Sequence, residues 1–182
     1  MYETKRLILG DWQDNDIEPF IQLNKDPKVM EFFPHIYSKE DSTESVKIFR
    51  KSIQQYGYGM FTCRLKANDE FIGFVGLMRR DIGFQFSPCV EIGWRIAYQY
   101  WGQGLAVEAA YKCLDIGFNK FNLDEIVSFT ASINKRSERV MQKLGMQRDY
   151  AHDFYHPKLD SNHPLARHIL YRLGKNNFIK KT

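Results

Sequence analysis

The sequence predicts a mixed α/β (α+β) fold, in which a twisted, mostly antiparallel sheet of about seven strands is flanked by helices. Residues 17–23 and 38–56 repeat apolar side chains at helical spacing, whereas residues 60–78 alternate them with a period of two, as strands do. In the second half of the chain, strand-like stretches at residues 89–97 and 125–133 are each followed by a helical stretch. This order is not that of a regular β-α-β winding.

Alternating or continuous apolar runs predict the strands. Residues 70–78 are apolar on both faces, as expected of a central strand, and the turn Asn68-Asp69 joins them to the preceding strand. Pro88 precedes the strand that leads into a glycine-rich loop. In chain order, strands are expected at residues 4–11, 60–66, 70–78, 89–97, 125–133, 146–155 and 167–173.

Apolar stripes with start and stop residues predict the helices. Ser38 begins a capping-box-like start of the longest helix, and Gly57 follows its end. Asn134 precedes the last helix and Gly145 stops it. Helices are expected at residues 17–23, 38–56, 104–118 and 134–144.

Length and composition fit a single domain over residues 1–182, because 43% hydrophobic residues can build one sizeable core. The net charge is +4, but basic and acidic residues are interleaved, so we expect no nucleic-acid partner. Cys63, Cys89 and Cys113 follow neither a disulfide nor a metal-binding spacing. With no leader and no apolar run approaching ~20 residues, we expect a cytoplasmic protein without a membrane partner.

Residues 99–106, Gln-Tyr-Trp-Gly-Gln-Gly-Leu-Ala, lie between a predicted strand and a predicted helix. Gly102 and Gly104 allow the backbone to approach a ligand closely, and the helix start offers unpaired amides and a positive dipole end. We therefore expect an anionic, phosphate-bearing ligand. Val107 stands where a dinucleotide fingerprint needs a third glycine, and no Walker loop is present. A glycine-rich helix start without a ligand remains the alternative.

Three segments together resemble the GNAT N-acetyltransferase superfamily. Gln99, Gly102 and Gly104 meet its Gln-x-x-Gly-x-Gly/Ala signature in full. The other two segments are Asn-Lys-Arg-Ser at residues 134–137 and Lys-Leu-Gly-Met at residues 143–146. More narrowly, the chain looks like the ribosomal-protein N-terminal acetyltransferase branch, which residues 4–9, Thr-Lys-Arg-Leu-Ile-Leu, and the strand at residues 71–77 also match. The likeness covers nearly the whole chain.

This resemblance implies acetyl-coenzyme A as co-substrate, without a metal, in a V-shaped splay between the fourth and fifth strands. It places the pyrophosphate on the amides of residues 99–106 and the pantetheine arm along the backbone near residue 95. It also implies that Asn134 holds this arm from the other side. A plain helix N-cap is the structural alternative for Asn134, and both roles can coexist. The residues implied in coenzyme binding are Trp94, Arg95, Ile96, Gln99, Trp101, Gly102, Gln103, Gly104, Leu105, Ala106, Asn134 and Ser137.

Glu91 and Ser137 are the catalytic candidates. Glu91 shares a strand face with Gly93 and Arg95, so it would accept the amine's proton through water; a salt bridge with Arg95 or a lysine is the alternative. Ser137 stands where the ribosomal-protein branch has a serine proposed to meet the coenzyme sulfur; a solvent-facing or backbone-bonded helix serine is the alternative. Many superfamily members carry a tyrosine acid where this chain has Met141. Gly93 is interpreted either as a bulge that turns an amide toward the thioester oxygen or as a packing gap.

We therefore expect an N-acetyltransferase that transfers acetyl to a primary amine by direct attack in a ternary complex. A protein N-terminal α-amine is the easiest acceptor, since its pKa near ~7.8 leaves roughly a tenth neutral at pH 7. A polyamine, amino sugar or antibiotic acceptor, a coenzyme-binding regulator and a nucleic-acid-binding module are the competing hypotheses. Monomer and homodimer both stay open. The residues His152, Asp153, His156, His163 and His168 fit no standard metal spacing, and we expect them at the acceptor cleft or on the surface.

Overall fold

The computed structural model describes residues 1–81 and 83–179. In this part of the chain the strands are β1 (Tyr2–Glu3), β2 (Leu7–Gly10), β3 (Met60–Leu65), β4 (Phe71–Arg80), β5 (Cys89–Ile96), β6 (Glu125–Ala131), β7 (Gln147–Arg148), β8 (Phe154–Tyr155) and β9 (Arg167–Gly174). The helices are α1 (Ile17–Lys25), α2 (Lys39–Tyr56), α3 (Leu105–Asp115) and α4 (Lys135–Lys143).

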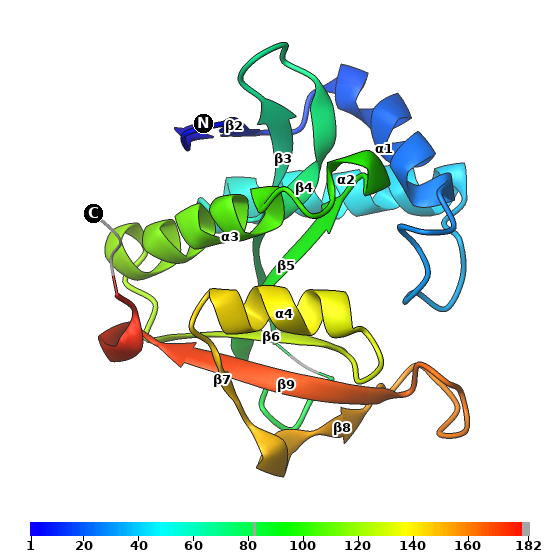
Figure 1. Ribbon diagram of the computed structural model, residues 1–182, viewed down its shortest axis with the longest axis vertical. Coiled ribbons are helices and arrows are strands. Elements are labelled where there is room, and N and C mark those ends of the chain that lie inside the picture. Colours follow the sequence, from blue (N-terminus) through cyan, green and yellow to red (C-terminus); the bar gives the residue numbers. More distant parts are fainter. Residues whose placement is uncertain (82, 180–182) are drawn as a thin grey trace.

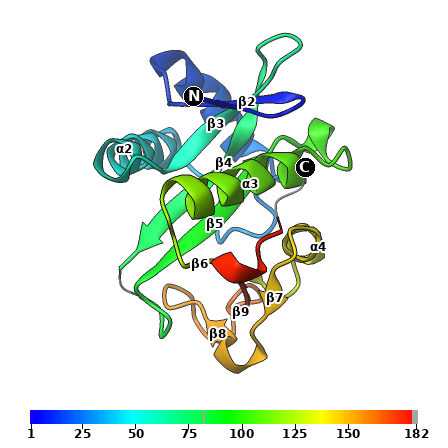
Figure 2. The ribbon, with the colours of Figure 1, turned by 90° about the vertical axis from the view of Figure 1, so that its left-hand side faces the viewer.

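All the described strands belong to one sheet, ordered β1-β2-β3-β4-β5-β6-β9-β7, with β8 beside β9. Apart from the parallel pair β5 and β6, the described neighbours are antiparallel. The predicted mixed, mostly antiparallel sheet is therefore confirmed. Helices cover both faces: α2 lies on one side of β3, β4 and β5, and α3 lies on the other side together with α4 (Figure 2).

The core has two parts that correspond to these two faces. Trp12, Phe20 and Phe74 belong to an aromatic cluster beneath α1 and α2. Ile92 and Leu114 belong to the larger cluster on the face of α3 and α4. Within residues 1–81 and 83–179, no helix combines the length and apolar character needed to cross a membrane.

Local signals set the helix ends as predicted. The Ser38 hydroxyl accepts the Asp41 amide at 3.0 Å, and the Asp41 carboxylate accepts the Ser38 amide at 2.9 Å. This capping box satisfies amides that the first turn of α2 leaves unpaired. After α2, Gly57 adopts the left-handed conformation with φ 75°, which glycine tolerates without a steric cost.

The first expected strand is divided in two. Instead of one extended stretch over residues 4–11, a turn separates β1 from β2. The Thr4 hydroxyl accepts the Leu7 amide at 2.9 Å, and the Thr4 amide donates to the Leu7 carbonyl at 3.0 Å. A side chain that satisfies the backbone locally competes with the strand ladder, so the alternation of Leu7 and Leu9 extends over β2 only.

The expected strand at residues 146–155 is also interrupted. β7 and β8 are separated by a 3-10 turn at Tyr150–His152, because the Asp149 carboxylate accepts from Arg172 Nε at 2.6 Å and contacts His152 Nδ1 at 2.8 Å. The helix expected at residues 104–118 is α-helical only as far as Asp115, and a π-helical turn, Ile116–Lys120, follows it directly. The additional breaks account for nine strands where about seven were expected.

The parallel strands β5 and β6 separate soon after they meet. Their pairing has one registered pair, Glu91 with Val127, and beside it the Ser128 hydroxyl donates to the Ile92 carbonyl at 3.0 Å. Beyond this point β5 continues to Ile96 along β4 alone, and the two strands diverge (Figure 1). The expected V-shaped splay is confirmed. Because the strands are parallel, the loops that follow them lie at the same edge of the sheet.

The close approach of β4 and the segment before β3 predicts a stability effect. A Cβ added at Gly76 would lie 2.0 Å from the Gly59 carbonyl oxygen, whereas one added at Gly10 meets only the Thr62 hydroxyl at 3.4 Å. We expect Gly76→Ala to lower the free energy of unfolding by about 1–3 kcal/mol or more, and Gly10→Ala to leave it nearly unchanged. Chemical denaturation measures both; equal midpoints for the two variants would contradict this packing.

Candidate active site

The glycine-rich loop leads from β5 into α3 through backbone conformations that favour glycine. Gly102 and Gly104 have φ values of 78° and 77°, and Gly104 is the N-cap residue of α3. A Cβ at Gly102 would meet nothing within 4 Å, and one at Gly104 would meet only the end of Arg6 at 3.8 Å. The space over these glycines is therefore open to a ligand.

The amides of this loop are available for binding. Within the described residues, the amides of residues 102–107 donate to no protein acceptor, and the first amide of α3 that is paired belongs to Glu108. Unpaired amides at a helix start, together with the helix dipole, form a binding site for an anion. In this loop Gln99 lies in a 3-10 turn, Gln103 Nε2 donates to the Gln99 carbonyl at 3.3 Å, and Ala106 follows the buried Leu105.

The edge of β5 offers backbone groups in line with this loop. Trp94, Arg95 and Ile96 pair with β4 on one side, and on the other side the described part of β6 has already diverged. Such an edge is a template for an amide-bearing chain. The Trp101 indole donates to the Ile96 carbonyl at 2.7 Å, so this ring anchors the loop to the end of the strand.

Asn134 and Ser137 lie at the start of α4, after the end of β6. The Asn134 side chain accepts the Ser137 amide at 3.1 Å and donates to the Thr130 hydroxyl at 3.0 Å. Asn134 is therefore the N-cap residue of α4, as the structural alternative for this residue predicted. The Ser137 hydroxyl is half-buried and makes no hydrogen bond to the described residues, so it is free to meet a ligand.

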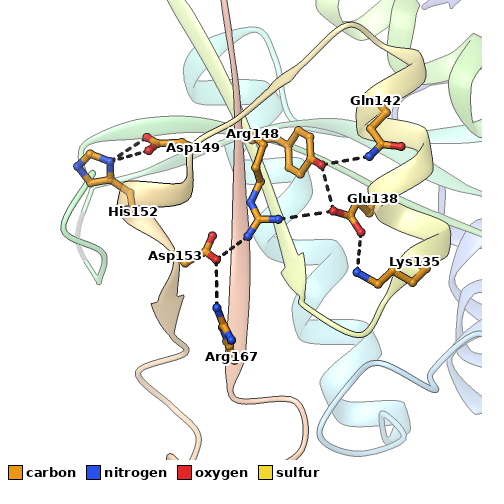
Figure 3. Close-up of polar contacts among 9 residues, drawn as sticks. Lys135, Glu138, Gln142, Arg148, Asp149, His152, Asp153 and Arg167 are labelled. Atoms are coloured by element: carbon orange, nitrogen blue, oxygen red, sulfur yellow. Dashed lines mark hydrogen bonds and ion pairs between the residues drawn. The ribbon is translucent and has the colours of Figure 1, made fainter.

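A network of polar side chains holds α4 in place (Figure 3). Glu138, next to Ser137, accepts from the Tyr171 hydroxyl at 3.1 Å, and its carboxylate lies 3.5 Å from Arg148 Nη1. The same arginine donates to Asp153 at 2.5 Å. Because Tyr171 belongs to β9, this network fixes the position of Ser137 relative to the sheet.

Glu91 lies on β5 at the point where the splay begins. Its side chain is 11% exposed and accepts from Arg80 Nε at 2.7 Å. Burial raises the pKa of this carboxyl group, and the charge and hydrogen bond of Arg80 act in the opposite direction. The salt-bridge alternative thus holds with Arg80 as the partner, rather than Arg95 or a lysine.

The Arg95 side chain points to the face of α1 and α2, with 7% of its surface exposed. Its Nη1 donates to Asn24 Oδ1, and the guanidinium lies 4.0 Å from the centre of the Phe33 ring. In the described part of the chain it contacts no carboxylate. Arg95 therefore offers the splay its backbone, while its side chain anchors the connection between α1 and α2.

The expected bulge at Gly93 is wrong. β4 and β5 pair without a register shift from Gly73–Ile96 to Arg80–Cys89, and Gly93 faces Gly76 within this ladder. A Cβ at Gly93 would lie 3.1 Å from the Met60 methyl group. The packing-gap interpretation fits, because the Met60 side chain occupies the space that a larger residue at 93 would need.

Two of the histidines, His156 and His168, lie beside an aromatic cluster that includes Phe129 and Phe154. His156 and His168 have ring centres 5.0 Å apart, and Phe154 lies 5.4 Å from His168. Burial lowers the pKa of His168 to about 4. In residues 1–81 and 83–179, no three His, Cys, Asp or Glu side chains come together as a metal site would require.

Most of the chain, from β2 to the end of α4, matches a known family. Residues 6–147 match the family model described as "Acetyltransferase (GNAT) domain". The chain belongs to the GNAT family.

The chain also resembles individual proteins in sequence or in fold. The chain is 33% identical to YkkB of Bacillus subtilis over 144 residues, which are 79% of this chain and 83% of that protein. An acetyltransferase of the GNAT family from Bacillus anthracis has the same fold, with a TM-score of 0.78 and 23% identity over 96% of this chain and 98% of that chain. The structure of spermidine N-acetyltransferase from Vibrio cholerae in complex with CoA and spermine also has this fold. Its TM-score is 0.73, with 20% identity over 94% of this chain and 96% of that chain.

GNAT enzymes use acetyl-coenzyme A, and this chain is an acetyl-CoA-dependent N-acetyltransferase. Its residues fit that co-substrate: open space over Gly102 and Gly104 and unpaired amides suit a pyrophosphate, and the free edge of β5 suits the amides of a pantetheine arm.

Two residues of this site were not identified from the sequence. Arg6 and Glu108 contact each other and the glycine-rich loop. Arg6 belongs to the opening segment Thr4-Lys5-Arg6-Leu7, which matches the family pattern. The sequence pattern alone does not indicate what Arg6 binds. Arg80, the partner of Glu91, is likewise not recognisable from the sequence, because the charged residues 79–81 are typical of a solvated turn.

The open glycine cradle predicts the effect of a bulky residue. Gly104→Val places a β-branched side chain at φ 77° and over the amides, so acetyl-CoA affinity falls by about tenfold or more. Gly145→Val is the matched control, because Gly145 also has a positive φ, 79°, with open space around it, but it follows α4 and not the glycine-rich loop. Calorimetry measures both affinities; wild-type binding by Gly104→Val would contradict an anion site here.

The buried imidazole of His168 predicts a pH dependence of stability. Its pKa falls from 6.5 to about 4 in the folded state, so the unfolded chain binds the extra proton between these values. The contribution of the neutral His168 to the free energy of unfolding is fully present above pH 6.5 and is lost as pH falls toward 4. His168→Phe should flatten the Tm profile across this window, whereas replacing the exposed His35 with Gln should not; an unchanged slope in His168→Phe contradicts the prediction.

Proposed function

We propose that this GNAT enzyme acetylates a primary α-amine, with a protein N-terminus as the favoured acceptor, by direct attack in a ternary complex. The observation that carries the proposal is the splay of β5 and β6, which has a buried carboxylate at its base and a free hydroxyl, that of Ser137, at its opposite wall. The matching segments at residues 4–9 and 134–137 support a place in the ribosomal-protein N-terminal acetyltransferase branch. The chain acts as one domain over residues 1–182, and its three free thiols suit the cytoplasm.

Glu91 is proposed as the general base. As the amine nitrogen attacks the thioester carbonyl, the carboxylate takes the amine's proton through a bridging water molecule. Burial raises the pKa of Glu91, which brings the base closer to neutral pH and improves proton transfer. Arg80 opposes this effect at 2.7 Å, and so keeps the carboxylate charged when it has to accept the proton.

Ser137 is proposed to meet the departing sulfur. The carbon–sulfur bond breaks as the new carbon–nitrogen bond forms, and the Ser137 hydroxyl donates a hydrogen bond to the thiolate. A thiol with a pKa near ~8.5 leaves readily, so the methionine at position 141, where many relatives have a tyrosine, is compatible with turnover.

The cysteines do not supply an acyl-enzyme route. Burial raises the pKa of Cys63 to about 12 and that of Cys89 to about 11, and it also raises the pKa of the fully buried Cys113. Because thiolates are the nucleophilic form, these side chains stay unreactive near neutral pH. This supports direct attack by the amine.

The paired state of the acidic side chains favours a monoamine over a polyamine acceptor. At the splay Glu91 pairs with Arg80, and Glu31 pairs with Arg136 on α4. In the acidic group at the start of α2, formed by Glu40, Asp41 and Glu44, Asp41 closes the capping box and Glu44 pairs with Lys47 at 3.0 Å, so that Glu40 alone in this group has no ion pair among the described residues. A polyamine acceptor would need carboxylates that are not already neutralised. Polyamine, amino sugar and antibiotic acceptors remain the alternative.

An acceptor panel tests the proposed substrate class. Peptides beginning with Ala, Ser or Met should be acetylated at their α-amine, with kcat/KM above that for spermidine by about tenfold or more. The reaction products are identified by mass spectrometry. Preferential turnover of spermidine, or no turnover of any peptide, would overturn the proposed acceptor while leaving coenzyme binding intact.

Two substitutions test the proposed roles. Glu91→Gln should lower kcat by about 10²–10⁴ at neutral pH, with acetyl-CoA affinity unchanged, because it removes a base and not a coenzyme contact. Ser137→Ala should lower kcat by about tenfold. Cys89→Ser is the control and should keep full activity with intersecting initial-rate patterns; ping-pong kinetics with a trapped acetyl-cysteine would refute direct attack.

A further inference from the structure

The segment that opens the chain lies against the glycine-rich loop. Arg6 and Gln103 are 97 positions apart in the sequence, yet Arg6 Nη1 donates to the Gln103 carbonyl at 3.0 Å. Thr4 and Glu108, 104 positions apart, are joined by a hydrogen bond of 2.6 Å. The function derived above assigns no role to these contacts.

Glu108 binds both the side chain and the backbone of Arg6. Its Oε2 accepts from Arg6 Nε at 2.7 Å, and its Oε1 accepts from the Arg6 amide at 2.8 Å and from the Thr4 hydroxyl. Burial acts to raise the pKa of Glu108, but the hydrogen bonds from Thr4 and Arg6 outweigh it and the pKa is lowered. The carboxylate is therefore charged at neutral pH and holds the guanidinium through a charge-assisted bond.

The backbone of Arg6 is itself fixed. Its carbonyl accepts the Lys66 amide at 2.9 Å, so Arg6 extends the pairing with β3. On its other side, the Thr4 hydroxyl accepts the Leu7 amide at 2.9 Å and Leu7 is fully buried. Arg6 thus reaches the loop from a rigid support.

The bond to the Gln103 carbonyl has a consequence for the next amide. A trans peptide is planar, with its C=O and N–H directed to opposite sides. When Arg6 holds the Gln103 oxygen, the Gly104 N–H is directed away from Arg6. The bond also prevents the peptide plane between Gln103 and Gly104 from rotating freely. The unpaired amide of Gly104 is one of those that face an anion.

We propose that Arg6, held by Glu108, is a positioning residue that orients the Gly104 amide of the coenzyme loop. In this role Arg6 acts through the peptide, because its Nε and Nη1 are engaged by protein acceptors; a direct contact of the remaining nitrogen, Nη2, with the phosphate is the competing interpretation that the test below separates. The inference rests on coenzyme binding at this loop, which the proposed function also needs. It gives the Thr-x-Arg-Leu opening of the chain a chemical role.

Calorimetry with a small set of variants tests this proposal. Arg6→Lys keeps the positive charge but loses the fork that joins Glu108 to the Gln103 carbonyl. Arg6→Gln and Glu108→Gln break the pair from either side, and the double variant measures their coupling. Lys5→Gln is the matched control, since the side chain of this exposed neighbour makes no hydrogen bond or ion pair with the described residues. The probes are coenzyme A, dephospho-coenzyme A and pantetheine.

We expect Arg6→Lys, Arg6→Gln and Glu108→Gln each to weaken coenzyme A and dephospho-coenzyme A by about tenfold, and the double variant to be no weaker than either single one. Pantetheine, which lacks the pyrophosphate, should bind all variants as it binds the wild type. This unchanged affinity also shows that the variants are folded. Lys5→Gln should behave as the wild type.

Other outcomes overturn the proposal. Wild-type affinity in Arg6→Lys and Glu108→Gln, with loss only in Arg6→Gln, makes Arg6 a direct charge partner of the phosphate. Equal losses for pantetheine and coenzyme A make the pair a general stabilising contact. If the wild type itself does not bind coenzyme A, the proposed function fails together with this inference, and that result is distinct from the other two.

Discussion

The divergence of two parallel strands is the constraint on which the rest of this structure depends. β5 and β6 share one registered pair, Glu91 with Val127, and then separate. Backbone groups that lose a strand partner need another acceptor or donor, since unpaired buried groups are costly. The splay therefore creates a binding edge inside a sheet that is otherwise continuous, and it places the starts of α3 and α4 on opposite sides of that edge.

Two polar systems keep the walls of the splay in position. On one wall, Arg6 and Glu108 hold the glycine-rich loop; on the other, Arg148 and Tyr171 hold Glu138 and so the start of α4. Amides and a hydroxyl can bind a ligand well only if they are oriented before it arrives, because ordering them at that moment weakens binding. The free groups of the site are thus supported by side chains that are themselves held by hydrogen bonds and ion pairs.

The charged side chains on β5, Glu91 and Arg95, have few polar partners each. Glu91 is buried at the base of the splay beside one cation, Arg80, whose own side chain is 41% exposed. Arg95, on the same strand face, is held by Asn24 and by aromatic rings rather than by a carboxylate. Removing Arg80 would leave the buried charge of Glu91 uncompensated, so this pair links catalysis, as proposed here, to the stability of the sheet.

Local patterns determined the helices, most of the strands and the glycine-rich loop, because caps, stop glycines and apolar periods act within a few residues, as Ser38, Gly57 and Asn134 illustrate. Tertiary structure alone decided where strands break, as at Asp149, and which charges pair, as for Glu91 with Arg80 and Glu108 with Arg6. These contacts join segments up to 102 positions apart. Their energies depend on burial and distance in the folded chain, which no local pattern encodes.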